Sequence, residues 1–501
     1  MNNLFIHNRL TWIILSCCLA IVYFFTLHSV SLNIPIGDDF PAFVDITPEA
    51  FKGSLTLSDF FSQINEHRIF YDRIFWIGGI WIFNVIDFKT LTLIGNFSLV
   101  LIVLFFCSIQ GKYKLPAGLI LVFSLLFLSW VGYSNSLCSM MALQNFTFPL
   151  LIILGLWKMV NGQKLFDVLV GLLLLTVGFY TTGLGFVAII MGLIYLLYKK
   201  QHRALMIGTV ISFFSIAVYF IYYTPSPVQS NLFAGLSSPV ELIKRYLAFI
   251  GGILPISGLS PLPEIILGIL LLALFSWSLF RLRAKIPHAL LIILLFYLFL
   301  AAVVVLSRFE LNEYIANRFK INSAIIFAGI SILFILAIQN TKFRAIITAL
   351  LIVFTGLLNA FSYKSINDYR FWVDEFATDL INCKYGIETT AFQPKKASYI
   401  GNAFYNKDFQ RVYNGLSEEN LHIIDAEVKL TPIDASWYSI GSNERIKFEN
   451  LIHPVVIACA SDGKTLAYFP IHQSRLACKD VYGVIKSNVD CRFKLVELSI
   501  D

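Results

Sequence analysis

The sequence predicts a polytopic α-helical membrane protein with a soluble C-terminal domain that is α+β or β-rich. Of the 501 residues, 57% are hydrophobic and only 14% are charged, a balance that soluble chains of this length rarely show. Apolar runs of about 20 residues, long enough to cross a bilayer, recur as far as residue 361. Beyond that point charged residues return and the apolar runs are short. Two domains are therefore expected, at 1–361 and 362–501.

About eleven apolar segments are long enough to be membrane-spanning helices. The first exceeds the core of a signal peptide and lacks a clean small-residue cleavage site, so we expect an uncleaved helix. Two shorter apolar pieces, 74–88 and 247–259, are predicted to be interfacial or re-entrant; if both crossed, the count would be about thirteen. The predicted spans are 10–30, 91–110, 115–133, 147–160, 165–180, 183–198, 204–223, 262–280, 286–306, 321–339 and 345–361.

The orientation follows from the basic connections, which are expected to lie in the cytoplasm. This places the N-terminus in the cytoplasm and both the first loop, 31–73, and the C-terminal domain outside. The net charge of +7 is small and spread along the chain, and we recognise no nucleic-acid-binding module. The basic residues that set the orientation are Lys112, Lys114, Lys158, Lys164, Lys199, Lys200, Arg203, Arg281, Arg283, Lys285, Lys342 and Arg344.

The C-terminal part, 362–501, combines short alternating apolar runs with the hairpin turn signal Asp462-Gly463. An even number of cysteines in this one segment indicates two disulfides and an oxidising compartment. A four-thiolate metal site is the alternative, but no CxxC pair supports it. The cysteines concerned are Cys383, Cys459, Cys478 and Cys491.

The first loop carries two adjacent carboxylates, Asp38 and Asp39, directly after Gly37. An aspartate just outside a bilayer can serve as a general base that removes the proton of an attacking hydroxyl. Its neighbour can tune it, hold a divalent cation or orient the acceptor. The alternative is a solvated turn in which one aspartate caps a helix.

The second charged stretch of this loop is Asn65-Glu66-His67-Arg68, followed by Arg73. We expect it on an amphipathic interfacial helix, with Arg68 near Asp72 and His67 facing Tyr71. An arginine at this depth can clamp a phosphate diester. Snorkelling and an ion pair with Glu66 or Asp72 would explain the same residues.

A third group of charges lies at the predicted external end of two spans. Arg308, Arg318 and Lys320 break the positive-inside pattern, so either a phosphate-bearing ligand or an anchoring role is needed to explain them. Gln144 and Asn145 open the fourth span and are candidates for hydrogen bonds to a sugar.

This arrangement resembles the integral-membrane glycosyltransferases of the GT-C superfamily, and in size and topology the bacterial serotype-converting O-antigen glucosyltransferases. The resemblance covers about residues 10–361 as architecture. Its motif content rests on the first loop, with Gly37-Asp38-Asp39-Phe40 and residues 65–73, and on the segment that ends in Ala316-Asn317-Arg318-Phe319-Lys320. The C-terminal domain adds no specific match.

The resemblance implies transfer of a hexosyl, specifically glucosyl, group from a polyprenyl-phosphate-linked donor to O-antigen at the periplasmic face of the bacterial inner membrane. It assigns the essential acidic residue to Asp38 or Asp39. We expect the donor phosphate to be held by Arg73, Arg308 or Arg318, and the C-terminal domain to bind the glycan acceptor. The resemblance leaves open whether the protein needs a divalent cation, Mg²⁺ or Mn²⁺. It also leaves open whether the protein has a donor synthase and a flippase as partners.

Two other functions would explain parts of the same pattern. O-antigen polymerases and ligases also handle lipid-linked glycans, but they usually place a large functional loop late in the chain. A lipid-linked-sugar flippase or transporter would show charges at mid-membrane and broken helices in paired positions. Only the piece at 247–259 fits that pattern.

Overall fold

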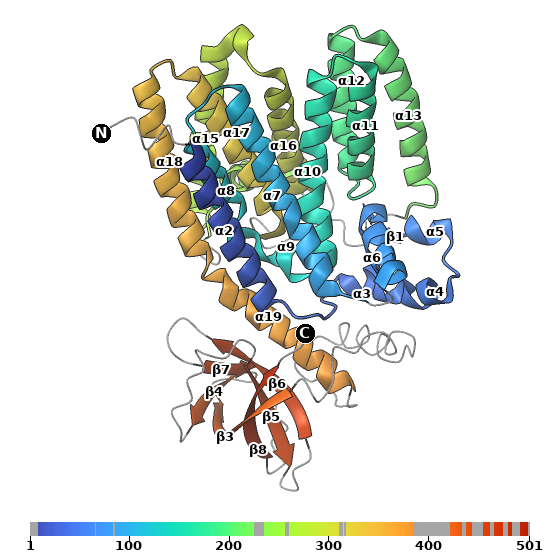
Figure 1. Cartoon of the computed structure of the whole chain (residues 1–501), viewed down its shortest axis with the longest axis vertical. Helices are drawn as coiled ribbons and strands as arrows, with labels where there is room; N and C mark the ends of the chain where they lie inside the picture. The colour runs from blue at the N-terminus through green and yellow to red at the C-terminus, as the bar shows by residue number, and fades with distance from the viewer. Residues whose placement is uncertain are drawn as a thin grey trace.

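The computed structural model describes residues 9–65, 67–83, 86–224, 235–255, 260–309, 314 and 317–384, together with six strands between 421 and 498. The described part is mainly helical (Figure 1). The longer helices are α2 (Arg9–Val30), α7 (Phe88–Lys112), α10 (Ser139–Asn161), α13 (His202–Phe220), α15 (Leu262–Leu282), α16 (His288–Ser307), α17 (Lys320–Ala337), α18 (Thr341–Ser362) and α19 (Ser365–Lys384). The shorter ones are α3 (Asp39–Ala42), α4 (Thr47–Lys52), α5 (Leu57–Phe60), α6 (Phe70–Phe83), α8 (Leu119–Phe127), α9 (Tyr133–Leu137), α11 (Leu165–Phe179), α12 (Gly185–Tyr198) and α14 (Pro239–Ile250).

Within the described residues, nine helical runs are long and apolar enough to cross a membrane. They coincide with nine of the predicted spans, although the third is broken at Leu128 between α8 and the short helices that follow it. The other two predicted spans are the apolar helices α11 and α12, which have only 15 and 14 residues. At 1.5 Å per residue they are shorter than the hydrocarbon core of a typical bilayer, which is about 30 Å thick, so their crossing stays a prediction.

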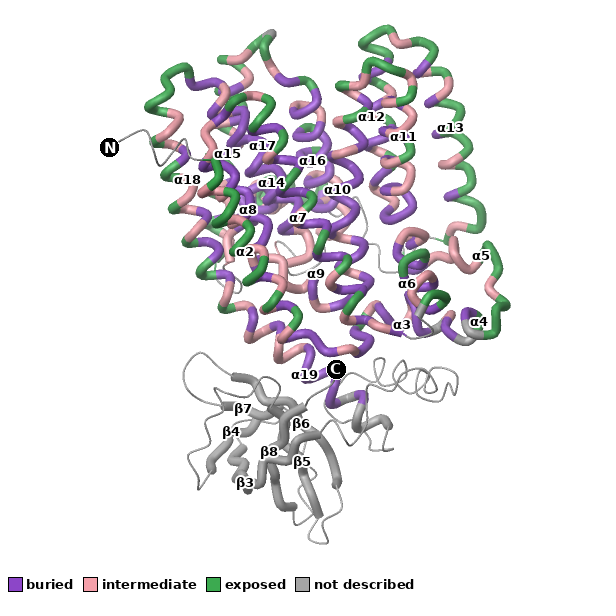
Figure 2. Tube along the Cα trace, in the orientation of Figure 1, coloured by how far each residue is buried: buried purple, intermediate pink, exposed green. Residues whose placement is uncertain are grey.

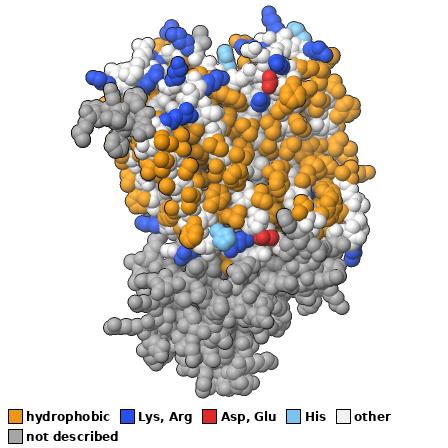
Figure 3. All heavy atoms as spheres, in the orientation of Figure 1, with side chains coloured by type: hydrophobic (Ala, Val, Ile, Leu, Met, Phe, Trp, Pro, Cys, Tyr) orange, Lys and Arg blue, Asp and Glu red, His pale blue; other side chains and the backbone are white. Residues whose placement is uncertain are grey.

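The pattern of burial separates inner helices from outer ones (Figure 2). In α10 and in the run that contains α17, 83% of the apolar window is buried, against 17% in α2 and 22% in α13. The outer helices expose large apolar side chains such as Phe25 and Phe213. Figure 3 shows a broad apolar surface around the middle of the described part, with Lys and Arg at both ends of it and most of them at one end. Such a surface suits hydrocarbon and not water.

The two apolar pieces that we expected to be interfacial or re-entrant overlap in part with the short helices α6 and α14, and neither helix is among the nine runs. The chain after α14 lies directly on α15. A Cβ on Gly251 would lie 2.0 Å from the carbonyl oxygen of Glu264, and one on Gly268 would lie 2.0 Å from that of Leu247. Only glycine permits this contact between backbones.

Strands β3 (Leu421–Pro432), β4 (Trp437–Ser442), β5 (Pro454–Ala460), β6 (Thr465–Gln473), β7 (Lys479–Tyr482) and β8 (Cys491–Leu498) form a closed antiparallel barrel in the order β3-β4-β7-β6-β5-β8. β5 pairs with β6 across the segment that holds Asp462-Gly463. The barrel packs against α19, at the same end of the bundle as the first-loop helices α3 to α6 (Figure 1). The predicted disulfides fall on side chains outside the described residues.

Buried polar contacts fasten α19 to the membrane helices. The Tyr369 hydroxyl donates to the Ser136 carbonyl oxygen at 3.1 Å and shares a hydrogen bond of 2.7 Å with the Ser31 hydroxyl. Ser136 in turn donates to Asn96, which also accepts from Tyr23. The helix that leads to the barrel is therefore joined to α2, α7 and α9.

Candidate functional site

A cavity of about 440 Å³ lies where the first loop meets the ends of α10, α12, α16 and α17. It collects six of the residues singled out from the sequence: Asp38, His67, Gln144, Asn145, Arg308 and Arg318. Its apolar lining comes mainly from α10 and α16, through Met140, Met141, Phe148, Leu300, Val303 and Val304. The cavity thus combines charged and amide groups with a hydrocarbon-like wall.

The two adjacent aspartates have different surroundings. Asp39 is buried and accepts hydrogen bonds from the backbone N–H of Ile36 (3.0 Å) and Met140 (2.8 Å) and from the Ser139 hydroxyl (2.6 Å). Burial raises the pKa of Asp39, and these hydrogen bonds act in the opposite direction. Because Ser139 and Met140 open α10, the Asp39 carboxylate meets the positive end of a 23-residue helix. Asp39 therefore anchors the loop.

Asp38 is half-buried and lines the cavity. It stands at the N-cap position of α3, but its side chain makes no capping hydrogen bond, unlike the capping role considered from the sequence. Gly37 precedes it with a φ of 56°, a backbone conformation that favours glycine. The turn at Gly37 and the anchor at Asp39 together hold Asp38 at the cavity.

His67 reaches the cavity from a two-stranded hairpin, β1 (Gln63–Ile64) and β2 (His67–Arg68). The prediction that residues 65–68 lie on an amphipathic helix is wrong, because the helix α6 begins only at Phe70. Arg68 fixes the hairpin to the end of α13 by donating to the carbonyl oxygens of Tyr219 (2.6 Å), Ile221 and Phe61 (2.5 Å). The His67 Nδ1 lies 3.3 Å from the Thr182 hydroxyl.

Arg73, a predicted phosphate ligand, is buried inside the first loop and does not line the cavity. It donates to the carbonyl oxygens of Asp59 and Ser62, each at 2.7 Å, and to that of Ala42 at 3.4 Å. Burial lowers its pKa to about 10, so the guanidinium stays charged at neutral pH. The side chain holds the loop helices together.

Arg308 and Arg318 both lie beside the ring of Phe319, with guanidinium carbons 5.3 and 5.2 Å from its centre. The Arg318 backbone is held by Asn135, whose amide donates to the Arg318 carbonyl oxygen at 2.9 Å. No described residue accepts a hydrogen bond from the buried Nε of Arg318. Two neighbouring cations at one cavity suit an anionic ligand such as a phosphate.

The amides of Gln144 and Asn145 are oriented by their neighbours. Gln144 donates to the Thr181 carbonyl oxygen at 2.8 Å, and Asn145 donates to the Asn135 side-chain oxygen at 3.0 Å. Since the amide nitrogens are engaged in these bonds, the two side-chain oxygens are left as acceptors on the cavity wall.

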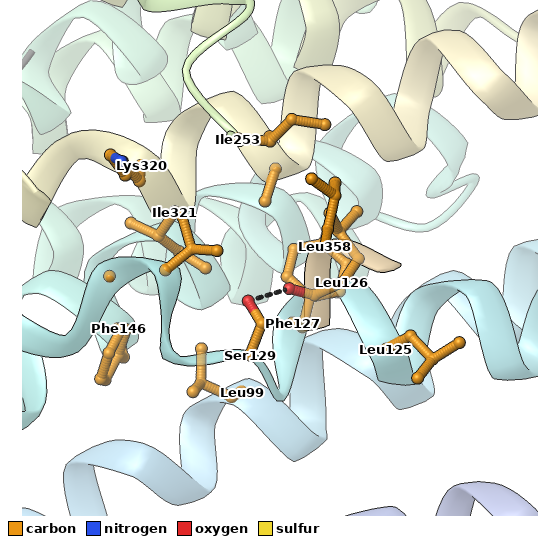
Figure 4. Close-up of a pocket in the computed structure, with 13 residues that line it drawn as sticks. Leu99, Leu125, Leu126, Phe127, Ser129, Phe146, Ile253, Lys320, Ile321 and Leu358 are labelled. Atoms are coloured by element: carbon orange, nitrogen blue, oxygen red, sulfur yellow. Dashed lines mark hydrogen bonds between the residues drawn. The ribbon is translucent and has the colours of Figure 1, made fainter. Parts of the chain in front are cut away.

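Lys320 does not line the main cavity. It borders a separate apolar cavity of about 30 Å³, shown in Figure 4, and its Nζ donates to the Leu254 carbonyl oxygen at 2.8 Å. The lysine thus fastens the chain after α14 to α17. Glu66 lies outside the described residues.

Asn322 also lines the cavity and was not singled out from the sequence as a ligand. It follows Arg318 by only four residues in the chain, and this proximity to a predicted ligand could have identified it. In the part of the chain that the structure describes, no group of three or more His, Cys, Asp or Glu could hold a metal ion. Whether the protein uses Mg²⁺ or Mn²⁺ stays open.

Comparisons with protein-family models, with curated proteins and with solved structures found no match to this chain. The composition and geometry of the cavity are therefore the observations from which a function can be inferred.

Proposed function

We propose that the chain is a GT-C-type membrane glycosyltransferase that acts at the periplasmic face of the bacterial inner membrane. It transfers a hexosyl group, with glucosyl as the first candidate, from a polyprenyl-phosphate-linked sugar to O-antigen or another surface glycan. The observation that carries this proposal is the composition of one cavity. A carboxylate, amide oxygens, two arginines and an apolar wall line the same 440 Å³ space. A lipid-linked sugar phosphate presents the complementary groups.

The reaction is a direct displacement at the anomeric carbon. Asp38 accepts the proton of the acceptor hydroxyl as the hydroxyl oxygen forms a bond to the anomeric carbon. The bond between the anomeric carbon and the phosphate oxygen breaks, and polyprenyl phosphate leaves with the electron pair. Arg308 and Arg318 stabilise the charge that develops on the phosphate.

The apolar wall supports a donor that arrives from the lipid. Leu300, Val303 and Val304 lie near the C-terminal end of α16, a helix of strongly apolar sequence. An isoprenoid chain bound along this wall would leave its phosphate at the arginines. The barrel, at the same end of the molecule, is proposed to hold the glycan acceptor.

The test compares two carboxylate substitutions in cells that carry the glycan. Asp38→Asn removes the proposed base with little change in shape, so the added hexose should vanish from the surface glycan in mass and linkage analysis. Asp167→Asn is the control, because Asp167 lies in the first turn of α11, at the end predicted to face the cytoplasm, where it is paired with Lys158 at 3.6 Å. Both proteins should accumulate equally in the membrane. Normal modification by Asp38→Asn would refute the assignment.

A further inference from the structure

Asn322 is a buried amide in α17 with an unmet hydrogen-bonding group. Its side chain lines the 440 Å³ cavity and the residue is only 6% exposed. No residue in the described part of the chain donates to its Oδ1. Leaving a buried amide oxygen without a donor is costly, so such an oxygen at a cavity is usually completed by a ligand or by water.

Arg318 lies in the single 3-10 turn, Asn317–Phe319, that leads directly into α17, and Asn322 is the third residue of α17. Both residues line the cavity. Arg318 stands at the start of the helical run and Asn322 lies further along it. A group attached directly to a phosphate at Arg318 would therefore come within reach of Asn322.

Gln144 and Asn145 add two acceptors to the same cavity. Their nitrogens are engaged by Thr181 and Asn135, and no other hydrogen bond involves their side-chain oxygens among the described residues. Together with the buried Oδ1 of Asn322, three amide oxygens have no donor among the described residues. A set of acceptors recognises a ligand that carries several donors, and the hydroxyls of a pyranose are such donors.

We propose that Asn322, supported by Gln144 and Asn145, forms the subsite for the sugar hydroxyls of the donor and that Asn322 is a specificity-determining residue. This inference rests on the proposed function, because it assumes a sugar phosphate in the cavity. It adds a division of the site: the arginines bind the phosphate whatever it carries, and Asn322 distinguishes a sugar-bearing phosphate from a bare one.

The experiment measures binding to the full chain in lipid nanodiscs with two probes, farnesyl phosphate and farnesyl phosphoryl-glucose. Asn322→Leu keeps a similar volume and removes the hydrogen bonds, and Asn322→Ala guards against misfolding through overpacking. Both should weaken binding of the glucosyl probe about tenfold, which corresponds to the loss of one hydrogen-bonded group, and leave farnesyl phosphate unchanged. Ser331→Val, a buried polar site on the same helix away from the cavity, is the control.

A second arm removes hydroxyls from the ligand. The probes are deoxyglucosyl analogues that each lack one hydroxyl. We expect one analogue to bind the natural sequence more weakly than the glucosyl probe but to bind Asn322→Leu as well as the glucosyl probe does. The hydroxyl missing from that analogue is then the partner of Asn322. Equal weakening of both probes, or no weakening of the glucosyl probe, would overturn the subsite while leaving the lipid-phosphate site intact. If the natural sequence binds neither probe, the proposed function fails together with the subsite.

Discussion

At the scale of single residues, identical side chains take different roles because their surroundings differ. Asp39 accepts hydrogen bonds from Ser139 and Met140 at the start of α10 and from the Ile36 backbone, whereas Asp38, one residue earlier, lines the cavity. Arg68 and Arg73 donate to backbone carbonyl oxygens that hold the loop in place, whereas Arg308 and Arg318 lie at the cavity. The residues that keep the loop folded are therefore separable from those that contact a ligand.

Asp72 gives a residue-scale prediction about pH. It is fully buried, neither of its oxygens accepts a hydrogen bond from a described residue, and burial raises its pKa well above 3.8 despite the charge of Arg73. The native state therefore keeps this proton at a pH where the unfolded chain has lost it. The stabilisation is complete below the unfolded pKa and is lost as pH rises through the native pKa.

Asp72→Asn keeps a neutral group of similar shape, so it should remove that part of the pH dependence. In nanodiscs the variant should be more stable than the natural sequence at pH 8 by about 1 kcal/mol or more, with a smaller difference at pH 5. Thermal unfolding midpoints at the two pH values measure this. An unchanged slope between pH 5 and 8 would contradict the buried-proton interpretation.

At the scale of elements, the site is assembled by short segments that are clamped to long helices. The hairpin β1–β2 is fastened to the end of α13 by Arg68, and the chain beside Arg308 is fastened to α14 by Arg245. Arg245 donates to the Phe309 carbonyl oxygen at 2.7 Å, pairs with Glu241 at 3.3 Å and lies 5.3 Å from the Tyr314 ring. A hydrogen bond from Tyr314 lowers the pKa of Glu241, which keeps this cluster charged.

Arg245→Ala should release the segment that carries Arg308. We expect faster hydrogen exchange at residues 307–309 and about tenfold weaker binding of farnesyl phosphate, because a charge-assisted hydrogen bond is lost. Lys244→Ala is the matched control, since Lys244 is more exposed and its Nζ lies 4.0 Å from Glu241, farther than Arg245 does. Arg245→Lys should restore the site only in part, because lysine lacks the planar fork of arginine. Equal exchange in the two alanine variants would show that Arg245 is not a clamp.

The sequence predicted which charged residues lie near one another better than the local structure that carries them. Hydropathy placed the nine long apolar runs, and external charges at their ends identified Asp38, Arg308 and Arg318 as neighbours in space. The helix expected at residues 65–68 was wrong, because the carbonyl oxygens that hold Arg68 come from Tyr219 and Ile221, far along the chain. Local periodicity carries no information about such contacts.

Asn322 was missed for a related reason. An asparagine inside an apolar run is unremarkable until the fold shows that its oxygen has no donor among the described residues and that a cavity lies beside it. Lys320 shows the opposite case. Its charge suggested a ligand contact, but the carbonyl oxygen of Leu254 is its partner.

At the scale of the whole molecule, the proposed function requires that the cavity lies on the non-cytoplasmic side and admits a lipid-linked head group. The first loop and the barrel lie at one end of the bundle, and most of the Lys and Arg visible in Figure 3 lie at the other. If the basic connections lie in the cytoplasm, as predicted, the first loop and the cavity lie outside.

The most direct measurement is labelling of Ser307→Cys, on the cavity wall, with a membrane-impermeant maleimide in intact spheroplasts. We predict that this cysteine reacts from outside and that farnesyl phosphoryl-glucose slows the reaction while farnesol does not. Gln163→Cys, at the opposite end, should react only after the membrane is permeabilised. Reaction of Ser307→Cys only after permeabilisation, or at a rate that the sugar phosphate leaves unchanged, would contradict the account.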